Sequence, residues 1–279
     1  MATTAENQTE ETEENFQQFY EKWKTQQNQH LQELITASEH APTNETMSTH
    51  LSNLVKSVVE HYEEYYKAKS KWAEENILLM LSPPWTSSLE NAFLWIGGWR
   101  PTMAIHLLYS KSGLQLEAKF SELIQGLLTK HDLGDLSPSQ LSRVDELQRK
   151  TINEEKEITE KMAKQQEKAA DADTVELSHL VSEAMREGGA NERNREAEEN
   201  QVESTLHPKE EGFKKILDRA DNLRLKTLRS IIEIFSPVQA VHFLIAAAEL
   251  HLRIHEWGKA KDERQLNGGV GHPISQQQT

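Results

Sequence analysis

Two histidines four residues apart carry the clearest chemical signal in this sequence of 279 residues. They are His251 and His255 in the stretch AELHLRIHEWG, which has a helical pattern. Residues four apart on a helix share one face, with Cβ atoms about 5–6 Å apart, and imidazole is a common ligand for iron and zinc. The pair therefore indicates a ligand site or, alternatively, packing at the edge of the core or a helix end whose cationic groups favour the helix dipole.

The sequence contains no recognisable catalytic arrangement. The HLRIH stretch has Leu252 where the helical zinc-protease motif needs a glutamate after its first histidine. There is no cysteine, and we find no phosphate-binding loop, dinucleotide fingerprint, serine nucleophile elbow or repeated Glu-x-x-His pattern. We therefore expect that the chain is not an enzyme.

The composition limits the classes of partner. A net charge of −14 opposes direct binding to nucleic acid, because the phosphate backbone repels an acidic surface. No window approaches the length of uncharged apolar sequence that spans a membrane, and the polar N-terminus resembles no secretory signal. We expect a nuclear or cytoplasmic protein, or one found in both compartments.

Apolar residues recur at three- and four-residue steps in nearly every window from Phe16 onward, which predicts an all-α helical bundle. A second helix is expected from Met47 towards Leu81, ending before a proline pair. Ser87 and Glu90 form a capping-box pattern, and the helix that they open is expected to end at glycines 97–98.

The motif SPSQ at Ser137 and the motif SPVQ at Ser236 both predict helix starts, with a serine cap and proline in the first turn. The helix from Ser137 is long and charged. We expect a flexible acidic linker at about residues 186–209. The predicted domain covers residues 15–258, between a disordered N-terminus (1–14) and a disordered tail (259–279).

Four blocks, in order, resemble the plant delay-of-germination family, whose domain also forms the C-terminal half of TGA-type bZIP transcription factors. They are FQQFYEKWKTQQNQHLQEL, PPWTSSLENAFLWIGGWRP, LSPSQLSRVDELQRKTINEEKEIT and the stretch from LDRADNLRLKTLRS to HLRIHEWG. The resemblance spans about residues 15–258. Without an upstream basic zipper, the chain is more similar to the stand-alone branch of that family.

The resemblance implies a regulator of seed dormancy and abscisic-acid signalling that binds type 2C protein phosphatases and self-associates. It also implies haem binding through a histidine pair, which corresponds to His251 and His255. Axial ligands stand on opposite faces of a haem, so we expect one histidine as the axial ligand and the other as an alternate ligand or as a partner that orients the first. The alternative is a transcriptional co-regulator that acts through bZIP partners and contacts DNA only indirectly.

Five further residues are candidates for partner binding. The aromatic stripe formed by Phe16, Tyr20 and Trp23 favours either the core or a helix laid into a partner's groove. Trp99 and Arg100 follow two glycines, and their side-chain types are enriched in binding hot spots. The alternative for this second group is a structural turn with a packed tryptophan.

Overall fold

The computed structural model describes residues 2–39, 45–124, 132–186 and 192–268, and within these ranges it contains helices and no strands. The all-α prediction is therefore confirmed. The helices are α1 (Ala2–Glu39), α2 (Glu45–Glu75), α3 (Ile77–Leu81), α4 (Ser88–Phe93), α5 (Pro101–Ile124), α6 (Pro138–Glu167), α7 (Ala172–Arg186), α8 (Glu192–Ile234) and α9 (Pro237–Gly268), with single 3-10 turns at Leu133–Asp135 and Lys168–Ala170.

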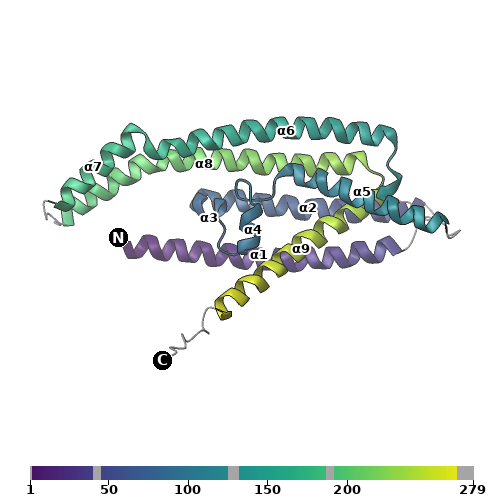
Figure 1. Ribbon diagram of the computed structural model, residues 1–279. Helices are drawn as coiled ribbons and strands as arrows, with labels where there is room; N and C mark the ends of the chain where they lie inside the picture. Colours follow the sequence, from purple (N-terminus) through teal and green to yellow (C-terminus); the bar gives the residue numbers. More distant parts are fainter. Residues whose placement is uncertain (1, 40–44, 125–131, 187–191, 269–279) are drawn as a thin grey trace, which may run out of the picture.

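The helices form an elongated bundle (Figure 1). Helices α1 and α2 run antiparallel, α9 crosses α1 obliquely, and α6 lies along α8. The short helix α4 packs against α9. No helix in the described part of the chain is long and apolar enough to cross a membrane.

Capping residues set several helix starts, as the sequence predicted. Ser87 and Glu90 exchange hydrogen bonds in a complete capping box at α4, and Ser137 with Gln140 does the same at α6. At α9, the Ser236 amide donates to the Gln239 side chain over 3.0 Å. These bonds satisfy backbone N–H groups that a helix start leaves without partners.

Two predicted helix ends are wrong. The second helix breaks at Asn76, whose side chain accepts a hydrogen bond from the amide of Leu79 and so starts α3 as a separate turn. Helix α4 ends at Phe93, before the glycines. The reason is a tight turn in which Ile96 (φ 48°) and Gly97 (φ 66°) are left-handed, a conformation that no helix continues.

Three segments predicted to be irregular are largely helical. Residues 2–14 belong to α1, residues 192–209 of the expected linker belong to α8, and residues 259–268 of the expected tail continue α9. All three are rich in glutamate, glutamine, lysine, arginine or alanine, which have high helix propensity even without an apolar stripe. Residues 1, 187–191 and 269–279 of these predictions lie outside the described part.

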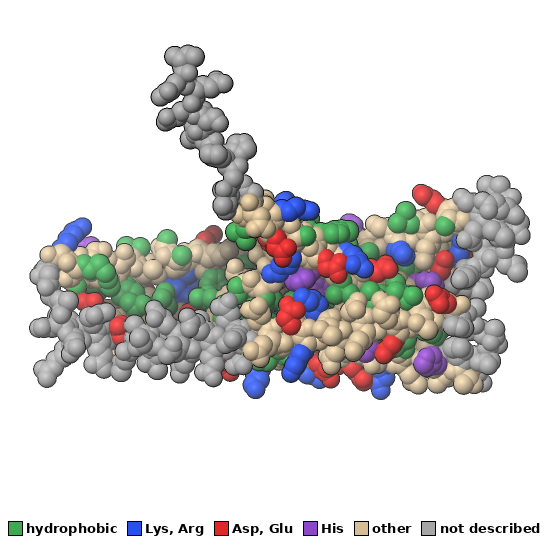
Figure 2. All heavy atoms as spheres, turned by 90° about the horizontal axis from the view of Figure 1, so that it is seen from below, with side chains coloured by type: hydrophobic (Ala, Val, Ile, Leu, Met, Phe, Trp, Pro, Cys, Tyr) green, Lys and Arg blue, Asp and Glu red, His purple; other side chains and the backbone are tan. Residues whose placement is uncertain are grey.

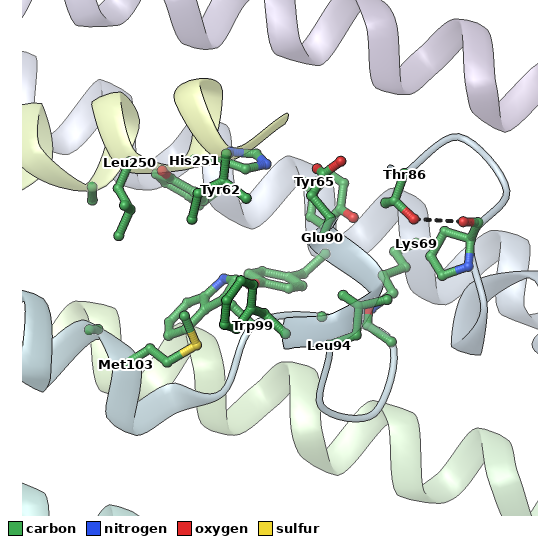
Figure 3. Close-up of a pocket in the computed structure, with 18 of the residues that line it drawn as sticks. Tyr62, Tyr65, Lys69, Thr86, Glu90, Leu94, Trp99, Met103, Leu250 and His251 are labelled. Atoms are coloured by element: carbon green, nitrogen blue, oxygen red, sulfur yellow. Dashed lines mark hydrogen bonds between the residues drawn. The ribbon is translucent and has the colours of Figure 1, made fainter. Parts of the chain in front are cut away.

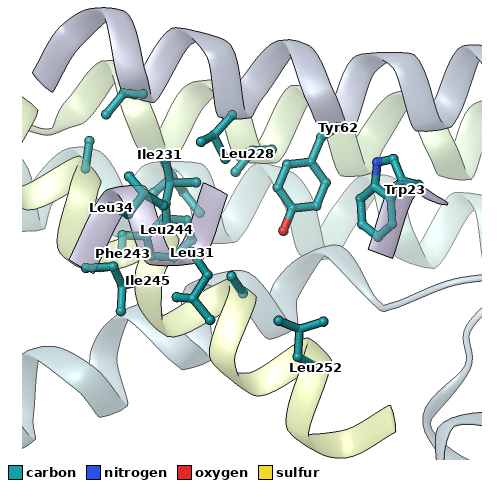
Figure 4. Close-up of a cluster of buried hydrophobic side chains, with 14 of the residues drawn as sticks. Trp23, Leu31, Leu34, Tyr62, Leu228, Ile231, Phe243, Leu244, Ile245 and Leu252 are labelled. Carbon is teal, nitrogen blue, oxygen red and sulfur yellow. The ribbon is translucent and has the colours of Figure 1, made fainter. Parts of the chain in front are cut away.

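The main core lies where α1, α2, α8 and α9 meet. Figure 4 shows Leu31 and Leu34 of α1 gathered with Leu244 and Phe243 of α9, and Trp23 of α1 beside Tyr62 of α2. A smaller cluster of Ile158, Ile216, Ala220 and Leu223 joins α6 to α8. Acidic and basic side chains alternate over the face of the molecule seen in Figure 2.

Candidate functional site

His255 joins three helices in the interior. Its Nδ1 lies 3.0 and 3.1 Å from the two carboxylate oxygens of Glu90 on α4, and its Nε2 lies 3.0 Å from Nζ of Lys24 on α1. A lysine ammonium only donates. The geometry therefore assigns a neutral ring that accepts from Lys24 through Nε2 and donates to Glu90 through Nδ1–H.

Glu90 serves two structural roles at once. It accepts hydrogen bonds from the amide and hydroxyl of Ser87, both over 2.7 Å, and it also accepts from His255. Burial alone would raise the pKa of this carboxyl, but the hydrogen bonds from His255 and Ser87 outweigh burial and lower the pKa to about 2. Glu90 is therefore an ionised link between the start of α4 and the face of α9.

His251, one turn earlier on α9, has a different environment. Its Nε2 lies 3.5 Å from the hydroxyl of Tyr20, and its ring centroid lies 5.6 Å from that of Trp23. Burial lowers the pKa of His251 to about 4 against the opposing effect of the Glu90 carboxylate. The ring is therefore neutral at neutral pH, the form in which imidazole binds metals.

His251 also lines a cavity of about 210 Å³, named here the aromatic cavity. Figure 3 shows Leu250 and His251 of α9 on one side of this space, and Trp99 and Met103 on the other. Its lining is mostly aromatic and aliphatic and includes Tyr20, Trp23, Tyr62, Tyr65, Tyr66, Trp85, Phe93, Leu94, Trp99, Met103, Leu107, Phe243, Leu250, His251 and Ile254, with Lys69 and Glu90 as its charged members.

Arg224 of α8, fully buried, fixes the turn that forms one wall of the cavity. Its guanidinium donates to the carbonyl oxygens of Trp99 (2.7 Å) and Ile96 (2.9 Å), to the carbonyl of Trp95 and to the carboxylate of Asp221.

Lys69 ties the same turn to α2 and shares a partner with Arg224. It donates to the Gly97 carbonyl (2.7 Å) and to Asp221 (3.1 Å). Burial lowers the pKa of Lys69 to about 8, with Asp221 opposing that shift. The sequence does not single out Lys69, Asp221, Arg224 or the role of Glu90, because only the fold shows which charged residues on a helical stripe point inward.

The five partner-binding candidates lie in three different environments: the core, the wall of the aromatic cavity and the surface. Phe16, Tyr20 and Trp23 are buried in the chain's own core, with 0 to 4% of their surface exposed, so they form no free docking face in this conformation. Trp99 lines the aromatic cavity. Arg100 is half-exposed, pairs with Glu155 over 3.0 Å and lies over the ring of Trp95.

The two histidines differ in how well their contacts would allow them to bind a haem iron. His255 has both ring nitrogens engaged by Lys24 and Glu90, so it does not fit as an axial ligand. His251 fits better because it is neutral and faces an aromatic cavity, although the cavity is smaller than the roughly 300–1,000 Å³ usual for ligand pockets. The described residues contain no group of three or more histidine, cysteine, aspartate or glutamate side chains that could hold a metal ion.

Comparison with known proteins gives consistent matches over most of the chain. The family model DOG1, described as seed dormancy control, matches residues 30–110. Protein DOG1-like 3 of Arabidopsis thaliana is 31% identical over 253 residues, covering 88% of this chain and 85% of that protein. Protein DOG1-like 4 of the same plant is 31% identical over 250 residues, covering 89% and 94%. Transcription factor TGA1, also from Arabidopsis thaliana, is 27% identical over 239 residues, covering 86% of this chain and 54% of that factor.

Proposed function

We propose the function of this chain from one premise, that it belongs to the DOG1 family of seed dormancy control. At the level of the family, it is a regulatory protein of the seed-dormancy type. Beyond this, we propose that it acts in abscisic-acid signalling by binding protein partners such as type 2C phosphatases. A relative named Protein RESPONSE TO ABA AND SALT 1, 24% identical over 246 residues, supports the link to this hormone.

One structural observation supports a role in binding. Phe93 and Leu250 both line the aromatic cavity and yet remain 55% and 37% exposed. Exposed apolar side chains beside a cavity are typical of interaction sites rather than of a closed core. Trp257 on α9 is also 59% exposed. We assign the partner-binding surface to Phe93, Leu250 and Trp257.

A pull-down with purified type 2C phosphatases tests this assignment. We expect the wild-type chain to retain a phosphatase, and Phe93→Ser or Trp257→Ser to weaken retention at least tenfold. Leu180→Ser is the matched control, because Leu180 is 42% exposed on α7. Equal retention by the wild type, both test variants and the control would disprove the assignment of the surface. No retention of any phosphatase would disprove the proposed partner.

A second candidate function is that of a transcriptional co-regulator that pairs with bZIP factors. The match to Transcription factor TGA1 over 86% of this chain supports it, because the two proteins share most of this domain. The same pull-down with a TGA-type factor in place of the phosphatase discriminates between the two functions. Retention of the bZIP factor alone would favour the co-regulator.

We further propose that His251, rather than His255, is the axial ligand if haem binds. Haem titration of the purified chain, followed by the Soret band, tests this. The His251→Ala variant should lose the shifted band, whereas His255→Phe should keep it with altered affinity, because His255 acts only through Lys24 and Glu90. An undiminished band in His251→Ala would overturn the assignment.

A further inference from the structure

Three buried polar atoms without a hydrogen-bond partner lie together at the α1–α2 interface. They are Oε1 of Gln27, Nδ1 of His30 and Nε2 of His61; of these, Nδ1 of His30 makes no hydrogen bond but lies 3.4 Å from a carboxylate oxygen of Glu33. Buried polar groups are nearly always paired, because an unpaired one costs about 1–3 kcal/mol. The unpaired oxygen of Gln27 and the unpaired nitrogen of His61, together with the adjacent ring of His30, therefore indicate a binding site.

The two imidazoles are held at a separation that suits one shared metal ion. The ring centroids of His30 and His61 lie 5.0 Å apart, with the planes inclined at 61°. Two imidazoles on a tetrahedral zinc ion have their centroids about 5 Å apart, since each nitrogen lies about 2.0–2.1 Å from the metal. The observed separation agrees with this value.

The neighbouring side chains fix the orientation of the cluster. The Trp23 ring stacks on His61 with centroids 4.7 Å apart and planes 3° apart, and its indole N–H donates to the His61 carbonyl over 3.1 Å. The Gln27 amide nitrogen donates to the Tyr62 hydroxyl over 2.8 Å, which leaves the amide oxygen free. Trp23 and Tyr62 are visible side by side in Figure 4.

The charge state and access of the cluster also suit a cation. Burial, with His30 as a second cause, lowers the pKa of His61 to about 4, so this ring is neutral and able to bind metal at neutral pH. His61 and Gln27 are 4% and 1% exposed, whereas His30 is partly exposed. A carboxylate oxygen of Glu33 lies 3.4 Å from Nδ1 of His30 on the exposed side, which gives a cation an acidic entry path.

We propose that this cluster binds a divalent transition-metal ion of the zinc class, with His30 and His61 as nitrogen ligands and the Gln27 amide oxygen as a third donor. Imidazole selects zinc, copper or nickel over magnesium and calcium, which prefer all-oxygen sites. The bound ion would join α1 to α2 beside Trp23. The site uses other residues than the His251–His255 pair, although His61 and His251 both contact the ring of Trp23.

Zinc uptake by the purified full chain tests the proposal, with a chromophoric chelator as competitor and thermal unfolding in parallel. The wild type should bind one zinc per chain and unfold at a higher temperature with zinc present. His30→Gln and His61→Phe should each weaken binding tenfold or more, and phenylalanine retains the stacking on Trp23. His179→Gln, at an exposed histidine of α7, is the matched control and should bind as the wild type does.

A second readout identifies the ligands directly. Nitrogen-15 NMR of the histidine rings should show zinc-dependent shifts for His30 and His61 and none for His251. No uptake by the wild type would overturn the proposal, as would unchanged uptake by both cluster variants or NMR shifts confined to other histidines. If His61→Phe fails to fold by circular dichroism, the partly exposed His30→Gln and the NMR shifts decide the question.

Discussion

Two regions of this molecule are held together by different means. The bundle around the aromatic cavity is packed with rings, and Phe16 alone has four aromatic neighbours. Among the described side chains of the arm formed by residues 162–186 and 192–212, Leu177 is the buried apolar one. Polar contacts hold the arm instead, such as Gln165 donating to the Lys209 carbonyl over 2.6 Å and Lys209 pairing with Asp171 over 2.5 Å.

The difference shows where polar groups matter for stability. In the bundle, charged groups such as Arg224 and Glu90 are buried and have specific partners, so removing one leaves the others unpaired in a low-dielectric interior. In the arm, Lys209 and Asp171 remain 14% and 33% exposed, so water can replace a lost contact at lower cost than in the bundle. Substitutions should therefore have large effects in the bundle and small effects in the arm.

The largest effect is expected from Arg224→Met. The change removes the guanidinium from the carbonyls of Trp95, Ile96 and Trp99 and leaves the Asp221 carboxylate with Lys69 alone, and breaking a buried ion pair costs about 3–5 kcal/mol. Urea unfolding measures the loss. Arg219→Met on the same helix, where the pair with Glu157 is exposed, should cost less than about 1 kcal/mol. Equal losses in the two variants would contradict the comparison.

Acid should destabilise the bundle through His251. Its pKa is about 4 in the folded chain and 6.5 ordinarily, so between these values the unfolded chain binds a proton that the folded chain does not. Stability therefore falls as the pH falls from 6.5 to 4, by on the order of 2–3 kcal/mol for this residue. Urea unfolding at pH 7 and pH 4.5 measures this effect. The free energy of unfolding should fall less between the two pH values in His251→Phe than in the wild type.

The exposed His179 of the arm is the control for that experiment. In His179→Phe, the free energy of unfolding should change between pH 7 and pH 4.5 by as much as in the wild type, because the His179 ring faces solvent.

Glu90 adds a second acid transition at lower pH. Since its pKa is lowered from 4.5 to about 2, its contribution is complete above pH 4.5 and is lost as the pH falls towards 2.

A smaller loss is expected from Gly258→Ala in the bundle. A Cβ at this position would overlap the Ser87 hydroxyl and lie 3.1 Å from the Cβ of Leu89, so α4 and α9 would have to separate. Overpacking of this kind costs about 1–3 kcal/mol, partly offset by the better helix propensity of alanine. Thermal unfolding should show a lower midpoint, and an unchanged midpoint would show that α4 moves freely.

The same substitution in the arm, Gly212→Ala, should have the smallest effect. The new methyl group would meet only the amide end of Gln165, which can rotate away. Loss of the Gln165 contact and gain in helix propensity should nearly cancel, leaving a change within about 1 kcal/mol. A loss as large as that of Gly258→Ala would show that the arm is as tightly packed as the bundle.

Much of the fold could be predicted from the sequence, because its signals are local. The capping pairs at Ser87, Ser137 and Ser236 act within four residues, and the structure has a helix start at each. The break at Asn76 also uses a local signal, a capping side chain, which went unrecognised inside a strong apolar stripe. The helix at residues 192–209 was missed because propensity without an apolar stripe resembles disorder.

The sequence by itself determined the helical class, most helix starts and the shared face of His251 and His255, since each depends on spacing along the chain. Only the tertiary structure decided that the two histidines differ. Contacts 231 residues apart with Lys24 and 165 residues apart with Glu90 engage both nitrogens of His255, while His251 faces the aromatic cavity. Helical periodicity shows which residues share a face, but the helices packed against that face determine the chemistry of each residue on it.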